Sequence, residues 1–206
     1  MTPEYEKLFK TPVAHRIVEK RTKIVEQFAR SIADSSLQSI PCSPSKDAER
    51  KRCFVNVEDR ISKMGGSMLT GWIFNEYQNR SISTEAHAIW VAPFGEKKLD
   101  ITPHDRQPKR VLFLPDKRIE EKRGYTAGEI FLLSDDPRIN AIEAFSIELD
   151  KIKDEKFIGI NKAIDLLPSD LEFVMKKSGV PRDVAEYLWN LELHKNQLNF
   201  QKYGTV

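Results

Sequence analysis

Three residues of this chain have the types and the order that thiol catalysis requires. Cys53, His87 and Asp100 follow one another along the sequence. A thiolate is the attacking form of cysteine, a histidine exchanges protons near neutral pH, and a carboxylate can fix the tautomer of that histidine. Because such groups meet in the folded chain, they need not be neighbours in the sequence. The set predicts a cysteine nucleophile, a histidine base and an aspartate that orients the base.

Cys53 is expected on a helix that we predict from about Lys46 to Met64, ended by Gly65 and Gly66. Apolar residues recur at helical spacing along it, namely Phe54, Val57, Ile61 and Met64. Residues 50–52 are all basic, and both nearby cations and a helix N-terminus favour a thiolate. A helix that starts at Lys46 would leave Cys53 two turns in, where the dipole contributes little. The alternative interpretation of Cys53 is a small buried core residue.

His87 and Asp100 are predicted to lie on two neighbouring strands. These strands cover residues 85–92 and 97–101, and a tight turn at residues 93–96 joins them. Pairing about this turn places His87 near Asp100 or Ile101, where opposed Cβ atoms are about 5 Å apart. A shift of one residue would turn a side chain to the opposite face. The hairpin therefore makes the histidine and aspartate the best supported pair.

The elements around these residues indicate an α+β fold. Short strands at residues 67–77, 85–92, 97–101 and 110–114 are typical of an antiparallel sheet. Helices are predicted at about residues 12–33, 46–64 and 137–152, with a short segment at 160–167 and a helical hairpin at 168–193. We expect a sheet packed against the cysteine-bearing helix. The parts are an N-terminal helical segment (1–44), a core (45–118) and a C-terminal helical segment (119–206), together forming one compact domain.

The stretch His87-Ala88-Ile89-Trp90, followed by Leu99-Asp100-Ile101-Thr102-Pro103, resembles the histidine and aspartate strands of transglutaminase-like (papain-like) proteins. Cys53-Phe54-Val55-Asn56-Val57, Gly65-Gly66 and Gly71-Trp72 stand where that superfamily has its cysteine helix and first core strand. A group of small uncharacterised bacterial and phage proteins has a more similar pattern still. The resemblance covers residues 50–116, about a third of the chain.

The resemblance implies acyl transfer through a thioester, with water or an amine as acceptor and a protein or peptide-like amide as substrate. The enzyme would be a peptidase, a deamidase or transglutaminase-like. By the same likeness Cys53 is the nucleophile, His87 the acid and base, and Asp100 the orienting residue, with the Cys53 backbone N–H as one oxyanion donor. Candidates for a second donor or a supporting role are Asn56, Trp72, Asn75 and Trp90. The basic run before Cys53 and the long helical flanks depart from the family pattern.

The composition excludes several classes of protein. With 33 basic and 31 acidic residues the net charge is +2, which argues against a nucleic-acid or anionic-membrane partner. The N-terminus has no apolar run for a signal peptide, and no segment approaches the ~20 apolar residues of a membrane span. Two cysteines do not indicate a disulfide framework. We therefore expect a cytoplasmic protein with reduced thiols and no cofactor.

Two further chemical assignments compete with the triad. Cys42 is a second candidate nucleophile, but it lies in a Pro/Ser-rich loop without a helix dipole. His104 and Asp105 lie close to Asp100, although no second histidine or cysteine stands at ligand spacing, so we expect no metal.

Two other functions remain open. A non-catalytic binding module on the same fold would use the helical flanks for a protein partner or a homo-oligomer. A sheet that binds single-stranded nucleic acid would stack bases on Trp72, Tyr77 and Trp90 beside basic side chains. The basic side chains at the sheet edge would be Lys97, Lys98, Lys109 and Arg110.

Overall fold

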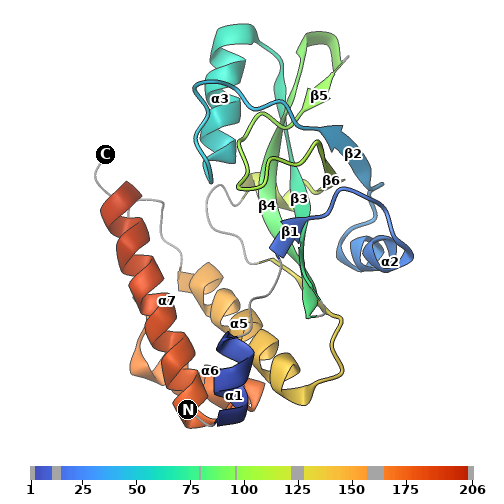
Figure 1. The fold of residues 1–206 in the computed structure, drawn as a ribbon. Coiled ribbons are helices and arrows are strands. Elements are labelled where there is room, and N and C mark those ends of the chain that lie inside the picture. Colours follow the sequence, from blue (N-terminus) through green and yellow to red (C-terminus); the bar gives the residue numbers. More distant parts are fainter. Residues whose placement is uncertain are drawn as a thin grey trace. The chain divides into compact units, whose positions relative to one another are not determined.

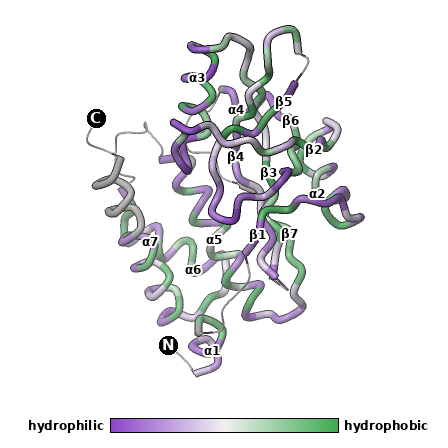
Figure 2. Tube along the Cα trace, turned by 45° about the horizontal axis from the view of Figure 1, so that its top comes forward, coloured by the Kyte–Doolittle hydropathy of each residue, from purple (hydrophilic) through white to green (hydrophobic). Residues whose placement is uncertain are grey.

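A computed structural model describes residues 3–10, 15–78, 80–95, 97–121, 128–156 and 165–203 (Figure 1). The chain divides into two compact units. One unit comprises residues 15–77 and 82–131 and contains the sheet; the other comprises residues 1–14, 78–81 and 132–206. Hydrophobic and hydrophilic residues alternate along the elements of both units (Figure 2). The expected α+β class is confirmed.

The sheet has the strand order β2-β6-β3-β4-β5, with β1 added to β3 and β7 added to β4. The pairings β1–β3, β2–β6, β3–β6 and β4–β5 are antiparallel. An antiparallel sheet was expected, but strands β1 and β2 were not predicted from the sequence. The strands are β1 (His15–Ile17), β2 (Gln38–Pro41), β3 (Ser67–Tyr77), β4 (Ser81–Val91), β5 (Lys98–Leu99), β6 (Arg110–Pro115) and β7 (Ile130–Leu132).

The two ends of the strand order approach each other, so that the sheet is nearly closed. Cys42, directly after β2, forms a parallel bridge with Asp100, directly after β5. Two backbone hydrogen bonds hold this bridge: Asp100 N–H donates to the Pro41 carbonyl (3.0 Å), and Ser43 N–H donates to the Asp100 carbonyl (2.8 Å). This closure places Cys42, a residue from early in the chain, next to Asp100 at the end of the β4–β5 hairpin.

Helix α3 (Cys53–Met64) covers part of the sheet with one apolar face. Val57 is completely buried there, among residues from β4 and the β5 region such as Ala88, Trp90 and Ile101. Gly65 ends the helix with a positive φ of 69°, as its sequence predicts. The remaining helical segments of this unit are α2 (Lys23–Ile32), the 3-10 turn η1 (Pro93–Gly95) and α4 (Arg118–Glu121).

Two helix predictions were wrong at their starts. The helix expected at 12–33 is replaced by strand β1, which pairs with β3, and by α2, which begins only after the N-cap Thr22. The helix expected from Lys46 begins at Cys53, because Asn56 binds both backbone polar groups of Glu49 and keeps that segment out of the helix. The helical spacing of apolar residues contains no information about such tertiary hydrogen bonds.

The second unit is helical, with a core formed by Phe145, Val174, Val184 and their neighbours. The expected hairpin near its end is present, and Gly179 separates its helices in a left-handed conformation (φ 70°). The segment expected at 160–167 falls largely outside the described residues. The helices are α1 (Pro3–Lys10), α5 (Pro137–Lys156), α6 (Pro168–Ser178) and α7 (Arg182–Tyr203). None of the described helices combines the length and the apolar sequence needed to cross a membrane.

Candidate active site

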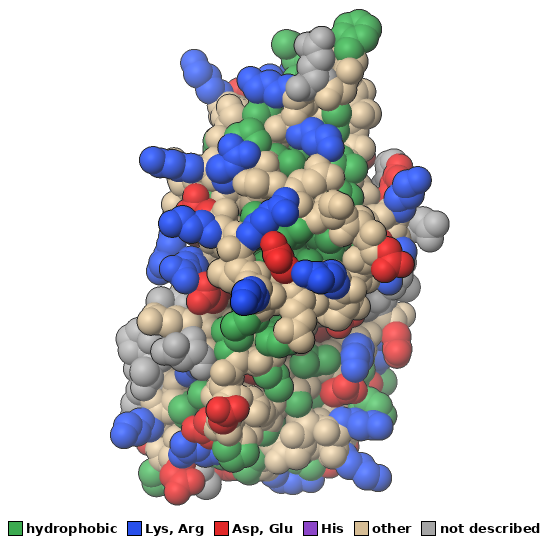
Figure 3. All heavy atoms as spheres, turned by 90° about the vertical axis from the view of Figure 1, so that its right-hand side faces the viewer, with side chains coloured by type: hydrophobic (Ala, Val, Ile, Leu, Met, Phe, Trp, Pro, Cys, Tyr) green, Lys and Arg blue, Asp and Glu red, His purple; other side chains and the backbone are tan. Residues whose placement is uncertain are grey.

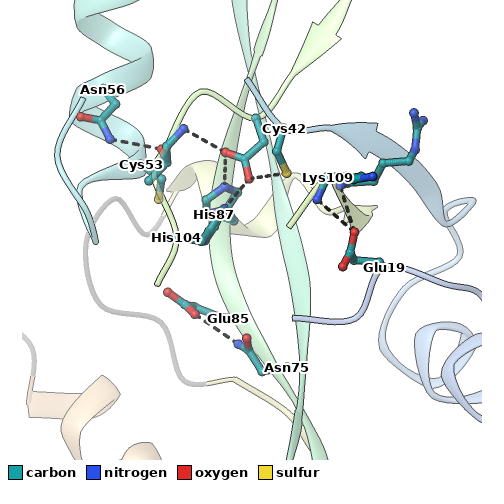
Figure 4. A network of polar contacts seen from close by, with 12 residues as sticks. Glu19, Cys42, Cys53, Asn56, Asn75, Glu85, His87, His104 and Lys109 are labelled. Carbon is teal, nitrogen blue, oxygen red and sulfur yellow. Dashed lines mark hydrogen bonds and ion pairs between the residues drawn. The ribbon is translucent and has the colours of Figure 1, made fainter. Parts of the chain in front are cut away.

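The carboxylate of Asp100 is the centre of a buried polar cluster (Figure 4). Its Oδ1 lies 3.0 Å from Nε2 of His87 and accepts the backbone N–H of Thr102 at 3.1 Å. Its Oδ2 lies 2.6 Å from Nε2 of His104. Because an ionised carboxylate only accepts hydrogen bonds, each histidine donates through Nε2. Nδ1 of His87 is therefore the nitrogen that can accept a proton.

The register of the β4–β5 hairpin explains how His87 reaches Asp100. Trp90 pairs with Leu99 and Val91 with Lys98, one residue away from the predicted pairing. Continuing this register places Ile89, not His87, opposite Asp100. His87 and Ile89 share a face of the strand, because side chains alternate with a period of two. The imidazole thus meets the carboxylate diagonally, at a separation that a long side chain can span.

Cys53 adjoins this pair from α3. It is the first residue of the helix, and its Sγ lies 4.0 Å from the carbonyl oxygen of Ala86, the residue before His87. Burial by itself lowers the pKa of His87. The negative charge of Asp100 outweighs this effect, and the charge of Cys53 and hydrogen bonding act in the same direction. Together they raise the pKa of His87 well above its usual value. The thiol of Cys53 is therefore close enough to His87 to affect the pKa of its ring, which is also hydrogen-bonded to Asp100.

The pKa of Asp100 moves in the opposite direction. Burial raises it, but the charge of His87 and the hydrogen bonds from His104 and His87 hold it well below its usual range. Asp100 is completely buried, so an ionised carboxylate here depends on these donors. The cluster is built to keep a negative charge next to the imidazole of His87.

The backbone before Cys53 forms a tight, unusual turn. Lys51 has a positive φ of 61°, which is uncommon for a residue with a side chain. Arg52 is the N-cap and makes no side-chain capping bond. The first N–H groups of a helix have no partner within the helix, so the N–H of Cys53 points out of its N-terminus. This arrangement suits an oxyanion that forms next to the sulfur.

The basic residues before Cys53 contribute less positive charge than the sequence suggests. Arg50 forms an ion pair with Asp105, and Arg52 forms one with Glu49. Both arginine side chains are exposed to solvent, which screens their charge. The position of Cys53 at the helix start is therefore the stronger feature of the two.

The four supporting candidates have hydrogen-bond partners of their own. Asn56 donates to the Glu49 carbonyl and to Thr102, and Asn75 donates to Glu85. The indole N–H of Trp72 donates to Asp116, and that of Trp90 donates to the Gly65 carbonyl. Of these side chains, Asn56 is linked to the cluster, because Thr102 also donates its backbone N–H to Asp100.

Two residues of the cluster were not assigned to it from the sequence. His104 was considered only as a metal ligand, yet it donates to the same carboxylate as His87. Cys42 was predicted to be a competing nucleophile in a loop, yet its Sγ lies 3.9 Å from Oδ2 of Asp100. Burial, followed by the charge of Asp100, raises the pKa of Cys42 to about 12. The short spacing between Asp100 and His104 in the sequence could have indicated that the two side chains meet. The bridge that brings Cys42 to Asp100 joins distant residues and leaves no such pattern in the sequence.

Comparison of the chain with family models, with curated proteins and with solved structures finds no match in any of the three. The arguments for a function therefore come from the cluster itself.

Proposed function

We propose that this protein is a cysteine-dependent amide hydrolase or acyltransferase of the transglutaminase-like (papain-like) kind. The observation that carries the proposal is the position of the His87 ring. Its Nε2 donates to the buried Asp100, while Cys53 at the start of α3 has its Sγ 4.0 Å from the carbonyl oxygen of Ala86, the residue before His87. This is the order of nucleophile, base and orienting acid that thiol catalysis requires.

The proposed reaction begins with transfer of the Sγ proton of Cys53 to Nδ1 of His87. The sulfur attacks the carbonyl carbon of an amide, and the N–H of Cys53 stabilises the oxyanion that forms. The C–N bond breaks as His87 returns its proton to the departing nitrogen, leaving a thioester on Cys53. Water or an amine then attacks the thioester, with His87 taking its proton and passing it to the sulfur. The cycle ends with a free thiol and a neutral imidazole.

Asp100 acts on His87 rather than on the substrate. Its hydrogen bond keeps the proton on Nε2, so that Nδ1 stays available for the thiol proton. Its negative charge stabilises the imidazolium that forms in the first step. Thr102, His104 and Cys42 make the other contacts to the carboxylate and hold it in place. Both cysteines are free thiols, which fits a reducing compartment such as the cytoplasm.

Alkylation by iodoacetamide, followed residue by residue with mass spectrometry, tests the proposal. We expect Cys53 to react faster than a model thiol at neutral pH, and Cys42 to react slowly because burial and Asp100 hold it protonated. His87→Gln should slow the reaction of Cys53 by at least about tenfold without changing that of Cys42. Cys42→Ser is the matched control. A Cys53 that reacts no faster than the model thiol, with no effect of His87→Gln, refutes the proposal.

A second candidate function is protein binding through the helical unit. Phe173, Tyr187 and Leu191 of α6 and α7 are exposed although they are large and apolar. A self-association surface would cover such residues. Light scattering after size-exclusion chromatography would detect it, and a monomer at all concentrations counts against this function.

A nucleic-acid-binding sheet has less support. Trp72 and Trp90 are buried with their indole N–H groups bonded, and Tyr77 stacks on His15 with ring centroids 4.8 Å apart. The two tryptophans therefore present no open ring face to a base. Basic side chains are interspersed with acidic ones on the face drawn in Figure 3.

A further inference from the structure

The side of Asp100 that faces away from His87 combines three kinds of metal ligand. One ligand atom of each of Cys42, Asp100 and His104, namely a sulfur, a carboxylate oxygen and a ring nitrogen, lies within 4.8 Å of the other two. They come from the end of β2, the end of β5 and the loop that follows β5. The parallel bridge between Cys42 and Asp100 fixes two of the three backbones relative to each other. No second cysteine or histidine stands at ligand spacing in the sequence, but the fold brings Cys42 next to Asp100.

We propose that Cys42, Asp100 and His104 bind one divalent transition-metal ion, with Zn²⁺ as the best fit. A thiolate, an imidazole and a carboxylate form a ligand set that zinc accepts and that calcium and magnesium, which require oxygen ligands, do not. Three protein ligands leave a fourth tetrahedral position for water. The proposal does not depend on the proposed reaction at Cys53, because Cys53 is not one of these three ligands.

The distances between the ligand atoms fit such an ion after small side-chain movements. Zinc bonds of ~2.0–2.3 Å at tetrahedral angles put neighbouring ligand atoms ~3.3–3.6 Å apart. The observed separations lie on either side of this range, at 2.6 Å between His104 Nε2 and Asp100 Oδ2 and 3.9 Å between Cys42 Sγ and Oδ2. The histidine ring has to withdraw, and the thiol has to approach, by less than ~1 Å each.

The proton balance of binding is simple. The hydrogen bond between His104 and Asp100 is replaced by two bonds to the ion, and the proton of His104 moves from Nε2 to Nδ1. The Cys42 thiol releases its proton to solvent. One thiolate and one carboxylate neutralise the two charges of the ion, which suits a site where Asp100 is completely buried.

The surroundings of the three ligands also suit a metal site. Oδ1 of Asp100 keeps its hydrogen bonds from His87 and Thr102, and such outer contacts orient a ligating carboxylate. Cys42 is partly exposed and the His104 side chain is 11 % exposed, so an ion can enter from solvent. Buried hydrogen bonds therefore orient the ligating carboxylate, and the exposed parts of Cys42 and His104 let an ion reach it from solvent.

Titration of the chelator-treated, reduced protein with Co²⁺ tests this inference, because cobalt replaces zinc in such sites and absorbs light. We expect one equivalent to produce visible d–d bands and a near-ultraviolet thiolate charge-transfer band, and Zn²⁺ to abolish both. Cys42→Ser should remove the charge-transfer band, and His104→Gln should weaken binding by about tenfold or more. Cys53→Ser is the matched control and should leave the bands unchanged.

Two results would overturn the inference: no charge-transfer band in the wild-type protein, or a band that survives Cys42→Ser and disappears in Cys53→Ser. Thermal unfolding gives a second measurement that does not depend on the cysteine variant. Zn²⁺ should raise the Tm of the wild-type protein but not that of His104→Gln, which lacks the imidazole ligand. An equal rise in both also overturns it. Alkylation of Cys53 in the presence of a chelator tests the proposed reaction separately.

Discussion

Replacing Asp100 with asparagine removes a charge from the buried cluster while nearly preserving its shape. The one remaining carbonyl oxygen is expected to stay at the Oδ1 position, because Thr102 donates there from the fixed backbone. The new NH₂ group then faces His104. Because an NH₂ group donates hydrogen bonds, Nε2 of His104 has to be unprotonated to accept one. The fold keeps its packing, but the contacts to both histidines change from charge-assisted to neutral hydrogen bonds.

The magnitude follows from the number of bonds that change. A hydrogen bond to a charged group contributes ~1.5–3 kcal/mol and a neutral one ~1 kcal/mol. Two such changes amount to about 2 kcal/mol of unfolding free energy. Asp100→Ala should cost more, about 3–5 kcal/mol, because it leaves buried donors without an acceptor. Asp105→Asn is the matched control, since Asp105 is exposed and its loss should change stability by less than ~0.5 kcal/mol.

The penalty for Asp100→Asn should depend on pH in a defined way. The folded-state pKa of Asp100 is lowered, so its contribution is present above about pH 4 and is lost as pH falls. The pKa of His87 is raised, so its contribution is complete below about pH 6.5 and is lost as pH rises through the folded value. The penalty should therefore be largest between about pH 4 and pH 6.5.

Urea unfolding in a chelating buffer measures this penalty. Tryptophan fluorescence in a Trp189→Phe background restricts the signal to Trp72 and Trp90, which lie in the sheet unit. If Asp100→Asn is as harmless as Asp105→Asn at about pH 5.5, the buried carboxylate does not hold the two histidines and the reasoning fails.

Two further results are expected from the same unit. Asp116→Asn should cost about 1–2 kcal/mol at about pH 7 and less at about pH 2, because the hydrogen bonds from Arg118 lower the pKa of Asp116 and this contribution is lost progressively as pH falls below about 4. Equal costs at both pH values in urea unfolding would contradict the assignment. Gly66→Ala should lower Tm strongly, since a Cβ there would lie 2.2 Å from the Val91 carbonyl oxygen and φ is +97°. Gly95→Ala, also at positive φ but with open space around it, is the control in thermal unfolding and should have the smaller effect.

The local part of the site could be predicted from the sequence because short-range patterns determine it. The apolar spacing of Val57 and Ile61 predicts the helix that carries Cys53, and Gly65 predicts its end. The tight turn near Phe94 predicts that β4 and β5 pair, which brings His87 close to Asp100. In these cases the relevant residues are separated by one turn of helix or one hairpin, so periodicity and turn chemistry carry the information.

Tertiary contacts decided the rest. The first residue of α3 depends on Asn56 binding the backbone of Glu49, and strand β1 depends on pairing with residues 75–77 of β3. The spacing of apolar residues predicts neither contact. Cys42 reaches Asp100, 58 residues away, through the bridge that nearly closes the sheet. Such a bridge requires β6, β3, β4 and β5 to lie between its two ends in that order, so its two residues share no local pattern that a sequence could display.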